Sequence, residues 1–248
     1  MIIANGKTIV LKDSANSGTV TSSGAIGQAV NNGTIKIESG NYVSTASTYA
    51  FWAGGKNQTG TIIVDNGEIT AQEGAISAGK DSVIIVNNGV FNAKDNAVLA
   101  SNGTAEYAGA NITVNGGTFN GAIQTPGYTG CGVYFPNNGV LTINGGIFNI
   151  AGVCVAARAG EVYINGGDFY SSVDTAGWVG DKKTQLTPNG VFYDGAANYP
   201  GLADNAKLKI TGGTFTNSTN TEVPAVKVTQ PTNGISINVE PGDWSVAE

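Results

Sequence analysis

The side chains in this sequence best suited to chemistry are a few carboxylates. The candidate acidic pairs are Asp65 with Glu68 and Glu161 with Asp168. Cleavage of a glycosidic bond uses two carboxyl groups on either side of that bond, one as the acid and one as the base or nucleophile. The sequence contains no Asp-Asp and no Asp-x-Asp. We therefore interpret these carboxylates as solvated charges on strand faces rather than as catalytic residues.

Composition narrows the function further. The formal net charge is -6, charged residues make up only 12%, and histidine is absent. Proteins that bind nucleic acid present clustered Lys and Arg, so nucleic acid is not an expected partner. Without histidine, the commonest metal ligand and the commonest acid-base residue at neutral pH are missing. We expect no metal site and no cofactor.

The N-terminal residues predict a chain without a targeting signal. Residues 1–7 lack a basic region followed by an apolar run, and no stretch approaches the ~18 apolar residues of a membrane span. We therefore expect no signal peptide and no membrane contact.

Cys131 and Cys154 fall on neighbouring repeats, three positions out of step. This offset disfavours a disulfide and predicts two free, buried thiols.

The chain is organised as a repeat with a period of roughly 25 residues. Seven segments share alternating apolar residues, then Asn-Gly-Gly or a variant, then an apolar or aromatic residue. Their matching glycines are Gly40, Gly67, Gly89, Gly117, Gly146, Gly167 and Gly213. Gly167 and Gly213 are 46 residues apart, which we interpret as two coils. A degenerate eighth copy is expected from Ile235 to Trp244.

Three short strands are expected in each repeat. The alternation has the period of a strand, and the recurring glycine supplies a positive φ before a second strand. That second strand carries Tyr42, Ile69, Phe91, Phe119, Phe148, Phe169, Phe215 and Trp244. A third apolar segment follows, at Ala50, Ala75, Ala97, Val133, Val153, Val191 and Ala225. No room for a helix remains between these strands.

This pattern predicts an all-β fold, a single-stranded right-handed parallel β-helix of about nine coils. We expect residues 1–248 to form one domain, with a cap or first coil at 1–33, regular coils at 34–216, and a degenerate coil and cap at 217–248. Like residues are expected to stack from coil to coil. The aliphatic ladder is Ile35, Ile62, Ile84, Ile112, Leu141, Val162 and Leu208, the aromatic ladder is Phe91, Phe119, Phe148 and Phe169, and the amide ladder is Asn87, Asn115, Asn144 and Asn165.

The Asn-Gly-Gly-Thr-Phe-Asn units resemble those of pectate-lyase-like right-handed β-helix proteins, which include polysaccharide lyases, bacterial surface proteins and phage spikes and fibres. The resemblance covers nearly the whole chain but rests on residues that make the fold. It implies that a lyase would hold Ca²⁺ with acidic residues and use an Arg or Lys as base. Arg158, with Glu161 alone nearby, supports this weakly, and the family's histidine motifs have no counterpart here.

Two long insertions carry the candidate binding site. They follow Gly121 and Ser171 at equivalent positions two coils apart, so they are expected to emerge from one corner. A third insertion follows Gly195. The first two bring aromatic and charged residues to one side. If these residues are exposed, they are suited to sugar stacking or to a protein interface. The alternative is that Trp178 folds back and covers apolar strand surface under its own loop. The predicted patch is Tyr128, Tyr170, Trp178, Asp174, Asp181, Lys182 and Lys183.

The two ends of the solenoid are expected to differ. Pro224, Pro231, Pro241 and Trp244 are suited to capping the C-terminal coil. At the other end no capping helix precedes Thr8, which leaves two alternatives. Either the first coil docks on another subunit, or residues 13–28 fold over it.

We therefore expect a non-enzymatic structural or binding protein. The favoured interpretation is a phage virion component, such as a capsid decoration, head fibre or tail-associated protein, with other virion proteins as partners. The family resemblance implies a homotrimer. The alternatives are a bacterial surface adhesin or glycan-binding module, located at the cell surface, and a polysaccharide lyase.

Overall fold

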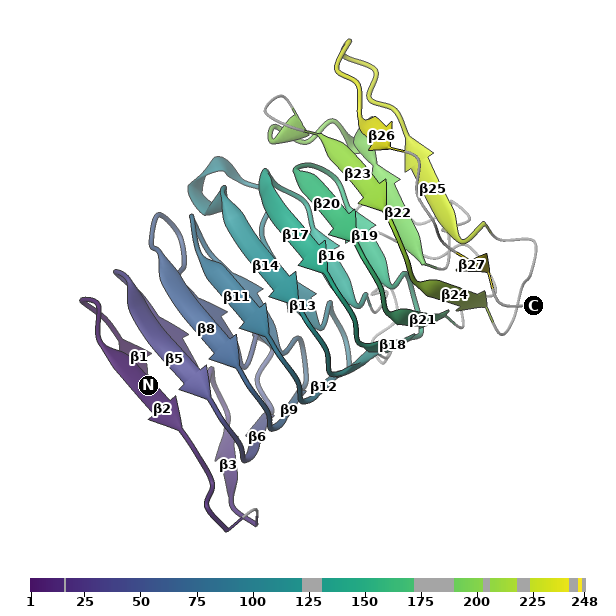
Figure 1. The fold of residues 1–248 in the computed structure, drawn as a ribbon. Helices are drawn as coiled ribbons and strands as arrows, with labels where there is room; N and C mark the ends of the chain where they lie inside the picture. Colours follow the sequence, from purple (N-terminus) through teal and green to yellow (C-terminus); the bar gives the residue numbers. More distant parts are fainter. Residues whose placement is uncertain are drawn as a thin grey trace.

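In the computed structural model the chain winds into a right-handed parallel β-helix (Figure 1). The structure describes residues 1–15, 17–121, 131–171, 190–202, 206–217, 224–240 and 245–246. The described strands form three parallel sheets of nine strands each, and every third strand belongs to the same sheet. The predicted fold class is confirmed.

Sheet A consists of β1 (Ile2–Ile3), β4 (Gly27–Ala29), β7 (Phe51–Ala53), β10 (Ile76–Ala78), β13 (Leu99–Ala100), β16 (Val133–Phe135), β19 (Val155–Ala157), β22 (Val191–Asp194) and β25 (Val226–Thr229). Sheet B consists of β2 (Thr8–Leu11), β5 (Gly33–Ile37), β8 (Gly60–Val64), β11 (Val83–Val86), β14 (Ala110–Val114), β17 (Gly139–Ile143), β20 (Glu161–Ile164), β23 (Lys207–Ile210) and β26 (Asn238–Glu240). Sheet C consists of β3 (Thr19–Ser22), β6 (Asn41–Ser44), β9 (Glu68–Ala71), β12 (Val90–Ala93), β15 (Thr118–Gly121), β18 (Ile147–Ile150), β21 (Asp168–Ser171), β24 (Thr214–Asn217) and β27 (Ser245–Val246). Two short 3₁₀ turns are η1 (Ala105–Tyr107) and η2 (Gly195–Ala197).

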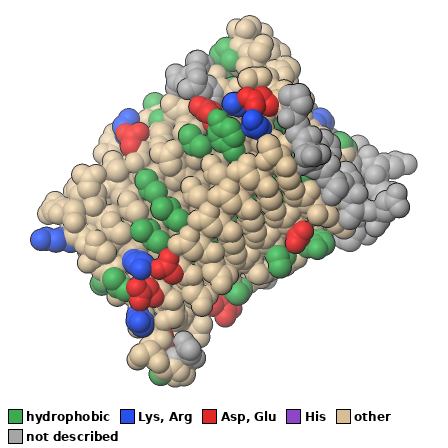
Figure 2. Space-filling view, viewed as in Figure 1, with side chains coloured by type: hydrophobic (Ala, Val, Ile, Leu, Met, Phe, Trp, Pro, Cys, Tyr) green, Lys and Arg blue, Asp and Glu red, His purple; other side chains and the backbone are tan. Residues whose placement is uncertain are grey.

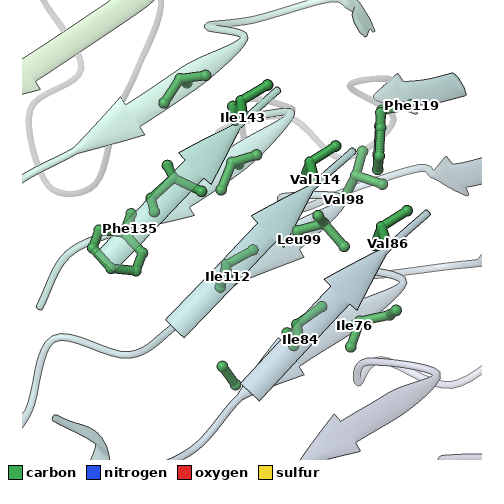
Figure 3. Packing of buried hydrophobic residues seen from close by; sticks show 14 of the residues in the cluster. Ile76, Ile84, Val86, Val98, Leu99, Ile112, Val114, Phe119, Phe135 and Ile143 are labelled. Atoms are coloured by element: carbon green, nitrogen blue, oxygen red, sulfur yellow. The ribbon is translucent and has the colours of Figure 1, made fainter. Parts of the chain in front are cut away.

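The hydrophobic core fills the space between the three sheets. Ile84 and Ile112 occupy one row of sheet B, and Ile76 and Leu99 come from sheet A in the same cluster (Figure 3). All four are fully buried. A single coil leaves its apolar row open, so each coil is stabilised by the coils on either side.

The predicted aromatic ladder is confirmed and is longer than expected. Phe91, Phe119, Phe148, Phe169 and Phe215 lie one above another on successive strands of sheet C. Neighbouring ring centroids are 4.9, 4.6, 4.9 and 4.8 Å apart, with interplanar angles of 7° to 13°. The strand spacing of ~4.8 Å forces this nearly parallel stacking on the rings.

The 46-residue interval between Gly167 and Gly213 is one coil, so its interpretation as two coils is wrong. Phe169 pairs directly with Phe215, and Val162 with Leu208. The extra residues lie in two connections between strands. One connection follows Ser171, and the other contains η2. Connections tolerate insertion because they do not change the strand register.

Two further predictions about the coil ends are corrected. Val246, and not Trp244, is paired with Phe215 in the last coil; Trp244 itself lies outside the described residues. At the other end, residues 13–28 do not fold over the first coil. They supply β3 and the start of β4, which pair with β6 and β7.

Cys131 and Cys154 are buried and form no disulfide, as predicted, but their offset differs from the prediction. Val133 pairs with Val155, so Cys131 and Cys154 are one position out of step and not three. Successive residues of a strand face opposite sides of the sheet. Cys154 accordingly belongs to the core between the sheets, and Cys131 to a second apolar cluster that includes Tyr49, Ala156 and Phe192.

Candidate functional site

Of the seven residues in the predicted loop patch, Tyr170 alone lies in the described part of the chain. It lies on β21 with its side chain 44% exposed. The other six residues, Tyr128, Trp178, Asp174, Asp181, Lys182 and Lys183, lie outside the described residues. The flanking strands do place both insertions at the corner where sheet C leads into sheet A, two coils apart.

The predicted amide ladder is present at the corner between sheets B and C. The side-chain amide of each asparagine donates to the side-chain oxygen one coil earlier, at 2.8 Å, from Asn165 to Asn144, Asn115 and Asn87. Asn87 donates in turn to the carboxylate of Asp65 at 2.7 Å. The ladder therefore has a direction, and it ends on a group that only accepts hydrogen bonds.

A second amide ladder on the outer face of sheet C was missed in the sequence. Asn149 donates to Asn120 at 3.0 Å, and Asn120 donates to Asn92 at 2.8 Å. Asn92 donates to the carboxylate of Glu68 at 3.0 Å. The signal was present, because an asparagine follows the aromatic residue in three consecutive repeats. Both ladders end on an acidic residue of the same coil.

A shallow groove of about 430 Å³ runs beside the first ladder across four coils. Its floor is backbone, since no side chain rises from the paired glycines. The second glycine of each pair is the constrained one. Gly146 has a φ of +112°, and a Cβ on it would lie 3.2 Å from the carbonyl oxygen of Gly117. At the first position two earlier coils have Asn66 and Asn88. Ile147, 41% exposed, and Asp168 form the wall on the side of sheet C.

Charged side chains lie towards the ends of sheet B, separated by a broad uncharged area (Figure 2). Near the first end, the ammonium group of Lys36 lies 2.9 Å from Asp65 and 3.1 Å from Glu38. The Lys36 hydrogen bond holds the pKa of the Asp65 carboxyl below its ordinary value, and the amide of Asn87 adds to this. Lys36 lowers the pKa of Glu38 in the same way.

The carboxylates of the two acidic pairs make separate contacts. Asp65 and Glu68 each accept the last hydrogen bond of a ladder. Glu161, on sheet B, accepts a hydrogen bond from the hydroxyl of Tyr163, whereas Asp168 lies on sheet C beside the groove. No group of three or more acidic or cysteine side chains able to hold a metal ion occurs among the described residues.

Arg158 is enclosed by aromatic rings instead of facing solvent. The residue is 2% exposed, and its guanidinium lies 4.9 Å from the ring centroid of Tyr199 and 5.6 Å from that of Tyr134. It donates a 2.8 Å hydrogen bond to the Tyr199 hydroxyl. Nearby, burial raises the pKa of the Cys131 thiol to about 12, so that thiol is protonated at neutral pH. The third insertion, which carries Tyr199, thus packs back over the coils.

Replacing the donating amide of one ladder asparagine by an accepting carboxylate tests whether the hydrogen bonds of the first ladder stabilise the fold. We expect Asn144→Asp to lower the free energy of unfolding at neutral pH by about 1–2 kcal/mol, because a carboxylate cannot donate to Asn115. Protonation restores a donor, so the loss should shrink as the pH falls below about 4. Urea denaturation at two pH values measures both effects, with Asn88→Asp, at an exposed position of the same corner, as the control. An equal loss at both pH values would contradict the proposed geometry.

The Lys36 cluster predicts how stability depends on pH. A carboxyl whose folded-state pKa is lowered stabilises the fold above its unfolded value of about 4, and this stabilisation is lost as the pH falls. We therefore expect the melting temperature of the native chain to drop more steeply on acidification than that of Lys36→Met. Thermal melts between neutral and acidic pH measure the difference. Lys7→Met, at an exposed position, should keep the native slope, and identical slopes for all three proteins would refute the role of Lys36.

No helix in the described parts of the chain is long and apolar enough to cross a membrane. Comparison with protein-family models, curated proteins and solved structures finds no match to this chain.

Proposed function

We propose that this chain is a non-enzymatic structural and binding component of a phage virion, such as a capsid decoration, head fibre or tail-associated protein. The observation that supports this proposal is the unbroken stacking of side chains along the β-helix. Phenylalanine rings stack without interruption from Phe91 to Phe215, and an amide ladder joins Asp65 to Asn165. A rod joined in this way keeps a fixed shape and presents its flanks to partners. By resemblance, the proposal includes a homotrimer.

Labelling particles with an antibody against the purified chain tests the proposal. We expect electron microscopy to place the label on capsids or tails of phage produced by the source cells. Label on intact, uninfected cells would instead support a bacterial surface protein. Cleavage of a uronate polymer in the presence of Ca²⁺ would overturn the non-enzymatic assignment.

A glycan-binding module is the second candidate, and the outer face of sheet C favours it. Tyr170 pairs with Asn149 and so lies one coil beyond the second amide ladder, with 44% of the residue exposed. Side-chain amides can exchange hydrogen bonds with sugar hydroxyls, and an exposed tyrosine ring is suited to stacking on a sugar face. We expect Tyr170→Ala to reduce retention on immobilised bacterial surface polysaccharide, whereas Tyr163→Ala, on sheet B, should not. Equal retention of both variants and the native chain would remove the support that the outer face of sheet C gives.

A polysaccharide lyase is the weakest candidate. Its base would be an arginine or lysine that reaches the substrate. Arg158 is 2% exposed and bonded to Tyr199, which weighs against that role.

A further inference from the structure

Among the described residues, the strands at both ends of the β-helix have one open edge. The strands β1, β2 and β3 pair on one side only, and so do β25, β26 and β27 at the other end. Each open edge carries unpaired backbone N–H and C=O groups, which can pair with another chain. Apolar side chains are exposed there too: Ile2 is 70% exposed, Val20 50% and Val239 48%.

The register makes the two edges complementary. On sheet B one inward row begins at Ile9 and ends at Val239, and on sheet A one begins at Ile3 and ends at Val228. Repeating the coil-to-coil step once more would set the end of each row on the start of the same row in another copy. Aliphatic side chains would then meet aliphatic side chains on both sheets, as they do inside the rod.

The backbone groups at the two edges match as well. Lys7 and Leu11 accept hydrogen bonds from β5 and from the residue after it, so the alternate residue Val10 turns its N–H to the open edge. At the other end Asn238 donates to Ala206, so Val239 turns its N–H outward. A parallel ladder can therefore continue across the junction.

The charges at the two ends of the chain favour contact between the N-terminal end of one copy and the C-terminal end of another. Residues 1–22 contain Lys7 and Lys12 against a single Asp13, whereas residues 224–248 contain three acidic residues against one lysine. Within one chain Lys12, whose side chain is 64% exposed, lies 3.5 Å from Glu38, and Glu240 forms ion pairs with Lys207 and Lys209. Glu240 ends the row that starts at Val10, so Lys12 of a second copy would lie diagonally across the junction from it, within reach of long side chains. Two like ends would instead bring like charges together.

We propose that the open edge of β1, β2 and β3 in one copy of this chain pairs with the edge of β25, β26 and β27 in a second copy. The assembly is head-to-tail. Such a contact does not close on itself, so repeated addition builds a filament along the axis of the β-helix. The inference is independent of the proposed virion role.

Prolines that remove one outward N–H at each end test the proposal. Val10→Pro blocks the first edge and Val239→Pro the last, while the N–H groups that bond within the chain remain. The native chain should show an average mass that rises with concentration in analytical ultracentrifugation, in steps of one chain. Each proline variant alone should stay monomeric. An equimolar mixture of the two should form a dimer that grows no further, because each variant keeps one open end.

Matched controls separate the junction from the fold. Val10→Thr and Val239→Thr keep the N–H groups and should assemble, and circular dichroism checks that every variant is folded. If a proline variant does not fold, Lys12→Glu provides a second test and should weaken assembly by at least tenfold. A native chain that stays monomeric at every concentration, or a single proline variant that dimerises by itself, would overturn the proposal.

Discussion

Replacing Phe148 by alanine is expected to lower the free energy of unfolding by about 3–5 kcal/mol, the largest effect of any single change considered. The ring is fully buried and stacks on Phe119 at 4.6 Å and on Phe169 at 4.9 Å. Alanine removes both contacts and leaves a cavity in the middle of the stack. Equilibrium urea denaturation, followed by circular dichroism, measures the loss.

Position in the stack provides the control. Phe91 stacks on one ring, that of Phe119, and has Ile69 on its other side. Phe91→Ala should therefore cost about 0.5–1.5 kcal/mol less than Phe148→Ala. Tyr170→Ala, on the exposed face of the same sheet, should change stability by less than about 0.5 kcal/mol. Equal costs at Phe148 and Phe91 would argue against a contribution from ring stacking.

Replacing Arg158 by methionine should lower the free energy of unfolding by about 2–3 kcal/mol. Methionine loses the charged hydrogen bond to Tyr199, worth about 1.5–3 kcal/mol, and the cation–π contacts with two aromatic rings. Its apolar side chain still packs against both rings, which offsets part of the loss. Thermal and urea denaturation measure the loss. We also expect limited proteolysis to cut sooner in the segment that carries Tyr199, because Arg158 holds that segment.

Lys207→Met is the matched control for Arg158. Lys207 lies 5.4 Å from the ring centroid of Tyr163 and forms an ion pair with Glu240, but on the solvent-exposed face of sheet B. Ion pairs of this kind contribute about 1 kcal/mol or less. A loss at Arg158 no greater than that at Lys207 would show that the aromatic enclosure adds nothing.

Much of the fold could be predicted because each coil repeats the same local demands. Gly146 is required both by its positive φ and by the backbone one coil below, so the glycines mark the register directly. Apolar residues such as Ile112 mark the inner faces in the same way. The predicted register was wrong where the repeat was interrupted. The 46-residue interval was divided evenly into two coils, although its extra residues lie in connections, whose lengths follow no period.

The candidate site was less predictable than the fold. The first amide ladder followed from alignment, but the second, through Asn120 and Asn149, depends on outward positions that the core does not constrain. The enclosure of Arg158 could not be foreseen, since Tyr199 comes from an insertion 41 residues later in the chain. Contacts made by insertions depend on how a connection folds back, which strand periodicity does not encode.

The three corners of this prism are unequal in their freedom to change. At the glycine corner an added methyl group meets the backbone one coil below, so mutation there is constrained at every level. At the other two corners, where sheet C leads into sheet A and sheet A into sheet B, connections of very different length join the strands without shifting the rows, as the pairing of Phe169 with Phe215 demonstrates. Selection can therefore lengthen, shorten or replace what is displayed along those two sides while the rest of the rod is inherited intact.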